Sequence, residues 1–364
     1  MPKANPLNEG AKHDYLVWLK DAQGRSDETL DAVAAAIDRF ETHAGHRDFR
    51  TFRREQASSF KAHLAKVRNS KTGKPLSKAT IVSTLNAVRA FFEWLAREPG
   101  YRSRIIVSDV AYFRPTAHDV RIATAKRDRP APSLEQVQHV LANMPAETTV
   151  QRRDRAVVAL ILATGARDAA VASLPLKRLD LAHRRLDQDA RDVKTKGRKT
   201  FSTGFYPVGD EAIAALEAWV RELKEDLLFG PDEPLFPATD IGLDDRGAFA
   251  PVGVTREFWT TASPIRAIFR KAFEAVGLPS HGPHSLRRML TARAYDLNLG
   301  LRERKAWSQN LGHESEVTTF GSYGTLSAHE QGEVMRRLSE ANVVASAPDV
   351  AAEIAELLRR RGVV

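Results

Sequence analysis

The segment Gly282-Pro-His-Ser-Leu-Arg-Arg288 places a histidine and an arginine where a helix is expected to begin. Pro283 suits the first turn of a helix, so His284 and Arg287 would share one helix face near the N-terminus. Free backbone N–H groups and the positive end of the helix dipole favour an anion there. The pattern therefore indicates a phosphate site, although an exposed His–Arg pair without a ligand is the more common occurrence of such a motif.

A second group of polar residues follows this segment. Leu311-Gly-His313 comes after an expected helix, and Tyr323 stands between small neighbours a short distance beyond it. A tyrosine hydroxyl can act as a nucleophile when a nearby group accepts its proton. Taken alone, a tyrosine in this context is most often a surface or half-buried aromatic residue.

The order His-x-x-Arg, Leu-Gly-His and Tyr, with these spacings, resembles the signature of the tyrosine recombinases, the phage integrase family. That family places an arginine in a Thr-Gly-x-Arg turn after an apolar helix, and Thr164-Gly-Ala-Arg167 stands in that position. It also places a lysine on a β-hairpin turn. Lys196, in Val193-Lys-Thr-Lys-Gly-Arg-Lys199, fits this position best, and Lys194 is the alternative.

The resemblance implies phosphodiester transesterification without a metal, ATP or another cofactor. Tyr323 would attack the scissile phosphate and form a 3′-phosphotyrosine and a free 5′-hydroxyl, which retains the bond energy. Arg167 and Arg287 would hold the non-bridging oxygens, because planar guanidinium groups suit phosphate and stabilise the growing negative charge. The sequence is consistent with this chemistry in having no Walker-type Gly-rich loop.

Proton transfer in this reaction needs an acid and a base. The resemblance makes Lys196 the expected acid for the leaving 5′-oxygen and His284 the expected base toward the tyrosine, whose free pKa is about 10. His313 is expected to orient the phosphate by hydrogen bonding. The expected catalytic residues are Arg167, Lys196, His284, Arg287, His313 and Tyr323.

Three features depart from the family pattern without removing a catalytic group. The acidic residue usual three positions after the first arginine is replaced by Ala170, with Asp168 nearby, so the support of that arginine is open. The spacing from His313 to Tyr323 is slightly longer than usual, and residues 229–262 look like an insertion.

Hydrophobic periodicity predicts a mainly α-helical chain, and 364 residues suit two domains. We expect a helical N-terminal domain, similar to the SAM-like core-binding domain of the family, and a mixed, mostly helical catalytic domain with a small β-sheet within 178–208. Ser77, and Ser133 with Gln136, are expected helix caps. The expected boundaries are 1–116 for the DNA-binding domain, 117–132 for a linker, 133–345 for the catalytic domain and 346–364 for a C-terminal helix. That last helix would pack either on its own protomer or on a neighbour.

The chain carries a net charge of +9, and much of this excess lies in one stretch. Residues 47–89 hold eleven Lys and Arg against two acidic residues. Such a stretch can bind a polyanion by releasing counterions from its phosphates, although a solubilising face is an equally common reason for it. The expected DNA-binding residues are Arg53, Arg54, Lys71, Lys74 and Lys78.

Composition excludes several classes of protein. With 43% hydrophobic and 28% charged residues the chain is typical of globular proteins, and no run approaches the roughly 20 apolar residues of a bilayer span. No secretory signal is recognisable, so we expect a cytoplasmic location and no membrane partner. Zero cysteines exclude disulfides and thiolate metal sites, and no metal-ligand cluster near the motifs supports a metal-dependent nuclease.

The expected partner is double-stranded DNA with a specific target site. The resemblance implies self-assembly, as a tetramer on two DNA sites, for integration, excision or resolution of a mobile element, and it allows accessory DNA-bending proteins. Two alternatives are a type IB topoisomerase-like enzyme and a non-catalytic DNA-binding or architectural protein. The full set of catalytic residue types argues against the second.

Overall fold

The computed structural model describes residues 5–69, 73–125, 130–243, 247–297, 299–312, 332–333 and 335–336. The chain divides into two compact units, Met1–Arg127 (unit 1) and Asp128–Val364 (unit 2), each with its own hydrophobic core. Within these ranges no helix is long and apolar enough to cross a membrane. The fold is mainly helical with small antiparallel sheets, which confirms the predicted fold class.

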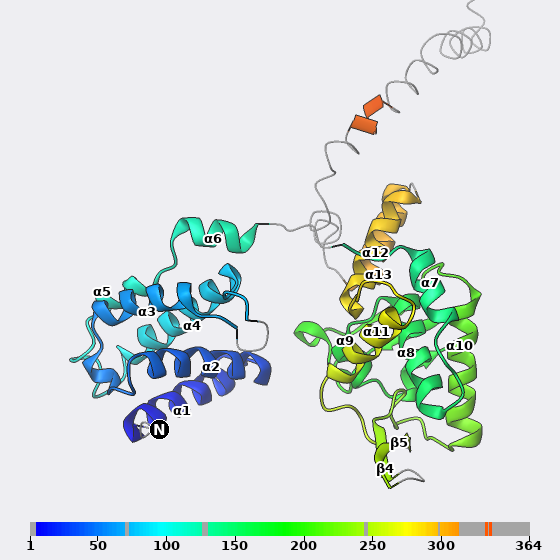
Figure 1. The fold of residues 1–364 in the computed structure, drawn as a ribbon, viewed down its shortest axis with the longest axis horizontal. Helices are drawn as coiled ribbons and strands as arrows, with labels where there is room; N and C mark the ends of the chain where they lie inside the picture. The colour runs from blue at the N-terminus through cyan, green and yellow to red at the C-terminus, as the bar shows by residue number, and fades with distance from the viewer. Residues whose placement is uncertain are drawn as a thin grey trace, which may run out of the picture. The chain divides into compact units, whose positions relative to one another are not determined.

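Unit 1 is a set of helices joined by turns and loops, coloured blue to cyan in Figure 1. Its elements are α1 (Pro6–Asp21), α2 (Asp27–His43), η1 (Phe49–Thr51), α3 (Arg54–Lys66), α4 (Lys78–Leu95), α5 (Val107–Val110), η2 (Ala111–Phe113) and α6 (Ala117–Thr124). Ser77 caps α4 as predicted, since its Oγ accepts a hydrogen bond from the Thr80 N–H at 3.1 Å. Helix α6 lies inside the segment for which we expected a linker, and an ion pair of 2.6 Å between Lys78 and Asp119 joins it to α4.

The core of unit 1 is a cluster of phenylalanine rings. Phe40 of α2 is fully buried, and its ring meets those of Phe60, Phe92 and Phe113 edge to face at centroid distances of 5.2, 5.2 and 5.3 Å. Edge-to-face contacts add to the burial of apolar area, because the positive ring edge faces the negative ring face. One ring on α2 therefore joins α3, α4 and η2.

Unit 2 is built around a buried helix. Its elements are α7 (Leu134–Ala142), α8 (Thr149–Thr164), α9 (Asp168–Ala172), η3 (Leu176–Arg178), β1 (Leu179–Asp180), β2 (Arg185–Gln188), η4 (Lys196–Arg198), β3 (Phe201–Gly204), α10 (Asp210–Arg221), η5 (Glu222–Asp226), β4 (Thr239–Leu243), β5 (Phe249–Val254), α11 (Ser263–Ala275), α12 (Pro283–Asp296) and α13 (Leu301–Asn310). Every residue of α8 from Ala156 onward is buried, and α7, α10, α11 and α12 all contact it. Its apolar second half explains this position, because a helix that is hydrophobic on all faces is stable only inside a core.

Two small antiparallel sheets complete unit 2. One has the order β1-β2-β3 and lies in the segment predicted to hold a small sheet. The other, β4-β5, falls within the segment 229–262 that the sequence suggested only as an irregular insertion. Buried Arg153 on α8 fixes the start of this hairpin, because its Nη1 donates to the Pro237 carbonyl and the Thr239 hydroxyl while its guanidinium lies 5.0 Å from the Trp259 ring centroid. The sequence pattern did not predict these strands, because they contain proline and glycine, which are uncommon within strands.

Replacing Phe40 by alanine should destabilise unit 1 by about 3–5 kcal/mol, because a large buried ring is lost and a cavity remains. We expect faster hydrogen exchange at the amides of α4 in the full chain, with the amides of α8 unchanged. Val17→Ala, at a side chain that is 43% exposed, is the matched control and should leave both unaltered. Equal exchange in Phe40→Ala and the wild type would contradict the importance of this ring.

Candidate active site

A cleft of about 410 Å³ opens in unit 2 where three chain segments meet. The start of α12 contributes Pro283, His284 and Arg287, and the turn after α8 contributes Arg167. The structure therefore brings together three residues that the sequence predicted as one site, although Arg167 and Arg287 are far apart along the chain. Asp168 and Arg266 line the same cleft.

The turn after α8 sets the direction of Arg167. Gly165 ends the helix with a φ of 62°, in the left-handed region that favours glycine. A Cβ on Gly165 would lie only 3.1 Å from side-chain carbons of Leu290 and Leu311, so the turn also needs a small residue for packing. The Thr164 hydroxyl donates to the Leu160 carbonyl at 2.7 Å and accepts from the Ala166 N–H at 3.2 Å. The Thr-Gly-x-Arg pattern is thus a turn that aims its arginine at the start of α12.

Arg287 connects the start of α12 to two other parts of unit 2. Its side chain is buried, at 4% exposure, and its Nη1 donates to the Gly165 carbonyl while its Nη2 donates to the Leu311 carbonyl at 2.6 Å. One guanidinium thereby ties helix α12 to the turn before Arg167 and to the residues that follow α13. A buried charge needs such partners, because leaving it unsatisfied costs several kcal/mol.

Arg167 differs from Arg287 in its surroundings. It is half-buried at the N-terminus of α9, and no residue in the described part of the chain forms a hydrogen bond or ion pair with its guanidinium. Burial lowers the pKa of Arg167 from its ordinary value, but an arginine stays charged at neutral pH. A partly desolvated cation without a protein acceptor is suited to an anion from outside.

His284 lies on the first turn of α12 with part of its ring exposed. Loss of hydration lowers the pKa of its imidazole, and the positive charges of Arg287 and Arg288 lower it further. Arg167 acts in the same direction, whereas Asp168 raises the pKa. At neutral pH the ring is therefore uncharged and able to accept a proton.

Asp168 does not form an ion pair with Arg167. It therefore does not replace the acidic residue that the family usually has at the position of Ala170. Its Oδ2 instead accepts a hydrogen bond of 2.6 Å from Nε of Arg266 on α11. Arg266 is thus a cation at the cleft that sequence reasoning missed. Nothing in its spacing sets it apart from other basic residues on an exposed helix face, so only the packing of α11 beside α9 reveals it.

The loop between β2 and β3 carries Lys194 and Lys196. The expected β-hairpin is present, but its strands pair only between 185–188 and 201–204, so residues 189–200 form a long loop in place of a short turn. Lys196 begins η4 and is exposed, and Gly197 next to it has a φ of 70°. Strand alternation therefore does not relate the two lysines, and neither lines the cleft.

His313 and Tyr323 lie outside the described residues, which include Gly312, the residue before His313. Gly312 has a φ of 68°, and a Cβ there would lie 2.7 Å from the Phe201 ring on β3. The glycine of the Leu-Gly-His motif is therefore needed for close packing of the end of α13 against the sheet. Asn310 strengthens this contact, since its amide donates to the Gly204 carbonyl at 2.8 Å and accepts from the Gly204 N–H at 2.6 Å.

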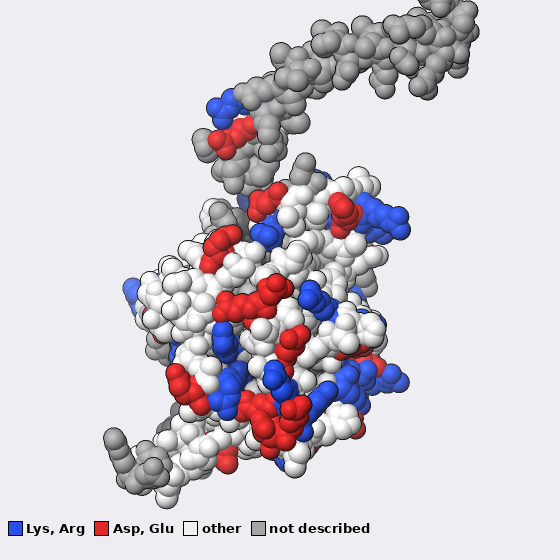
Figure 2. All heavy atoms as spheres, turned by 90° about the vertical axis from the view of Figure 1, so that its right-hand side faces the viewer, with Lys and Arg blue, Asp and Glu red and all other residues white. Residues whose placement is uncertain are grey.

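The predicted DNA-binding residues all belong to unit 1, and Lys71 among them lies outside the described residues. Arg53, Arg54 and Lys74 are exposed, and Lys78 is partly exposed with its ion pair to Asp119. In unit 2, Figure 2 shows Lys and Arg interspersed with Asp and Glu on the face on the α10 side, so that face is not uniformly basic.

Comparison with known proteins gives consistent results over both units. The model of the phage integrase family matches residues 133–330, and that of the phage integrase N-terminal SAM-like domain matches residues 13–99. A protein named tyrosine recombinase XerC from Roseiflexus sp. (strain RS-1) is 26% identical over 313 residues, which cover 84% of this chain and 86% of that protein.

Solved structures share the fold. A lambda integrase dimer bound to a COC′ core site aligns with a TM-score of 0.57 at 14% identity, over 88% of this chain and 99% of that one. The Tn1549 transposon integrase in complex with transposon right end DNA aligns with a TM-score of 0.54 at 15% identity, over 90% of this chain and 99% of that one.

Asp168→Asn should lower the pKa of His284 further, because the mutation removes the one negative charge that raises it and frees the Arg266 cation nearby. Arg167→Ala should have the opposite effect. Titration of the His284 ring by NMR measures both, with Asp210→Asn at the start of α10 as a control that should leave it unchanged. A rise in the pKa on Asp168→Asn would contradict this electrostatic picture.

Proposed function

The chain belongs to the phage integrase family and is a site-specific tyrosine recombinase that acts on DNA, and from this we propose which residues carry out each step. The observation that carries the proposal is Arg167, a half-buried guanidinium without a partner in the described chain, beside His284 at the start of a helix. These features suit one phosphate of the DNA backbone.

Arg167 binds a non-bridging oxygen of the scissile phosphate through its free guanidinium edge. The N-terminus of α12 adds its dipole to this site. Arg287 lines the same cleft, so its charge stabilises the phosphate even while its two Nη groups bond to backbone carbonyls. Together the two arginines stabilise the charge that grows on the phosphate in the transition state.

Tyr323 attacks the phosphate, and neutral His284 accepts the proton of its hydroxyl. The product is a 3′-phosphotyrosine with a free 5′-oxygen, which Lys196 protonates from the loop between β2 and β3. His313 orients the phosphate by hydrogen bonding. Attack by a 5′-hydroxyl on the phosphotyrosine then reverses the step with a new partner strand.

The enzyme assembles as a tetramer on two DNA sites and exchanges strands between them. The lambda integrase of similar fold is described as a dimer on a core site, which supports assembly on DNA. Unit 1 contributes Arg53, Arg54, Lys71, Lys74 and Lys78 to phosphate contacts. Accessory DNA-bending proteins complete the assembly where the target DNA must be bent, and the reaction serves integration, excision or resolution of a mobile element in the cytoplasm.

Tyr323→Phe should abolish covalent DNA adducts and leave DNA affinity nearly unchanged, because the hydroxyl is the nucleophile while binding depends mainly on phosphate contacts. The target site is first selected from random-sequence duplexes by repeated binding. A nicked suicide substrate of that site is then cleaved and analysed on a denaturing gel. A persistent adduct in the mutant would remove Tyr323 from this role, and Tyr101→Phe in unit 1 is the control.

Strand cleavage should proceed in EDTA without any nucleotide, since two arginines and a lysine stabilise the charge and donate the proton. The measurement is the cleavage rate of the same suicide substrate with and without added magnesium. Complete dependence of cleavage on magnesium would be decisive against the proposed mechanism.

Lys196→Ala should slow cleavage by about 10²–10⁴-fold, as is typical for loss of a general acid. Replacing the bridging 5′-oxygen by sulfur creates a leaving group that needs no proton, so this substrate should restore most of the rate. Lys194→Ala is the matched control, and it should weaken DNA binding with a smaller salt dependence and show no selective rescue. Rescue of Lys194→Ala alone would transfer the role of acid to Lys194.

A further inference from the structure

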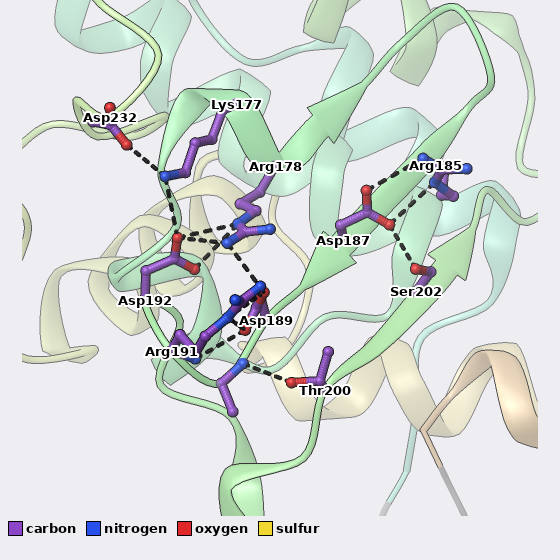
Figure 3. Close-up of polar contacts among 11 residues, drawn as sticks. Lys177, Arg178, Arg185, Asp187, Asp189, Arg191, Asp192, Thr200, Ser202 and Asp232 are labelled. Carbon is purple, nitrogen blue, oxygen red and sulfur yellow. Dashed lines mark hydrogen bonds and ion pairs between the residues drawn. The ribbon is translucent and has the colours of Figure 1, made fainter.

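The loop that carries Lys196 is held at its base by a group of charged residues (Figure 3). Arg178, at the end of η3, donates Nε to Asp192 Oδ1 at 3.1 Å and Nη2 to Asp192 Oδ2 at 2.7 Å. The same Nη2 lies 3.2 Å from Oδ2 of Asp189, which is buried. One guanidinium thus binds two carboxylates on the first turn of the loop, and the two-point contact with Asp192 fixes its direction as well as its distance.

The backbone that carries Arg178 is itself held by hydrogen bonds to a neighbouring segment. The backbone N–H groups of the two residues before it, Leu176 and Lys177, donate to the carbonyls of Glu233 and Pro231 at 2.8 and 2.9 Å. Leu176 is also buried in the core of unit 2. The loop is therefore tied to the core of the unit and does not depend on the short β2-β3 ladder alone.

A second anchor lies one residue beyond the carboxylates. Val193 is buried, and the N–H of Lys194 donates to the Ser173 hydroxyl at 2.8 Å. Ser173 ends α9, the short helix whose N-terminus is Arg167. The base of the lysine loop and the phosphate-binding arginine are thus attached to opposite ends of one rigid helix.

Lys196 follows two residues after this anchor, and two residues of chain span at most about 7 Å. Its own side chain is exposed. The position of its amine relative to a phosphate at Arg167 therefore depends on how firmly the residues before Lys194 are held. Without the pairs to Arg178, the first half of the loop would be held to the rest of unit 2 by the buried Val193 side chain, the longer Lys177–Asp192 ion pair of 3.5 Å and the hydrogen bond from the Ala190 N–H to the Thr200 hydroxyl. None of these contacts has the two-point geometry of the Arg178–Asp192 pair.

We propose that Arg178 is a positioning residue that, through Asp192 and Asp189, holds the loop so that Lys196 reaches the leaving 5′-oxygen. This inference rests on the proposed role of Lys196 as the general acid. It concerns proton delivery and not the binding of DNA, because Arg178 faces the loop carboxylates and is only 20% exposed.

The test compares the cleavage of two suicide substrates, one with the normal bridging oxygen and one with sulfur. Arg178→Ala should slow cleavage of the oxygen substrate by about 10²-fold, the size expected when a catalytic group is misplaced by about 1 Å. The sulfur substrate should restore nearly the wild-type rate. Asp192→Asn removes the same ion pair with almost no change of volume and should give the same pattern, so a folding defect in one variant does not decide the outcome.

Three further variants sharpen the result. Arg185→Ala is the matched control, because Arg185 lies on β2 and pairs with Asp187 and Asp180 without reaching the loop (Figure 3). It should cleave both substrates at the wild-type rate. Arg178→Lys keeps the positive charge but loses the two-point contact with Asp192, so its cleavage rate on the oxygen substrate should lie between those of the wild type and Arg178→Ala. Arg178→Ala combined with Lys196→Ala should be no slower than Lys196→Ala alone, since both changes remove the same proton transfer.

The outcomes distinguish the positioning role of Arg178 from the role of Lys196 as the general acid. If Lys196→Ala is rescued by sulfur but Arg178→Ala cleaves the oxygen substrate normally, or is equally slow on both substrates, the positioning role of Arg178 is overturned and that of Lys196 stands. If Lys196→Ala is not rescued, Lys196 is not the acid, and the positioning role falls with it.

Discussion

The buried guanidinium of Arg287 is the contact on which the geometry of the site depends. It satisfies two backbone carbonyls that belong to separate parts of the chain, those of Gly165 and Leu311. Because an arginine remains charged at any physiological pH, this connection is permanent, and it would be lost only with the fold of unit 2. The turn of Arg167, the start of α12 and the end of α13 are therefore parts of one structure and not three neighbouring loops.

The same packing explains why the motifs contain glycine at two positions. Gly165 and Gly312 both adopt positive φ and both pack where a Cβ would be too close to a neighbour, Leu290 or Leu311 in one case and Phe201 in the other. Two residues without a side chain therefore set the course of the backbone beside Arg167 and at the end of α13. This explains why the sequence motifs alone were sufficient to predict that Arg167, His284 and Arg287 lie in one cleft.

Other features required the folded chain. The sequence predicted the start of α12 at Pro283 and a helix before Leu311, but it could not predict the pairing of Asp168 with Arg266 across two helices. The length of the loop that carries Lys196 was also not predicted, since strand patterns do not show where the β2-β3 pairing stops or that Asp189 and Asp192 pair with Arg178. The hairpin β4-β5 was missed because it depends on Arg153, which sits on a helix far earlier in the sequence.

The role proposed for Arg167 sets function against stability. Folding removes much of the water around its guanidinium, and within the described chain no carboxylate or carbonyl compensates for that loss. The free enzyme is therefore less stable than a version with an apolar side chain of similar size would be, a cost that natural selection retains at sites of activity. In the proposed mechanism a DNA phosphate removes this cost on binding, so part of the affinity for the phosphate would be free energy that the protein stored when it folded.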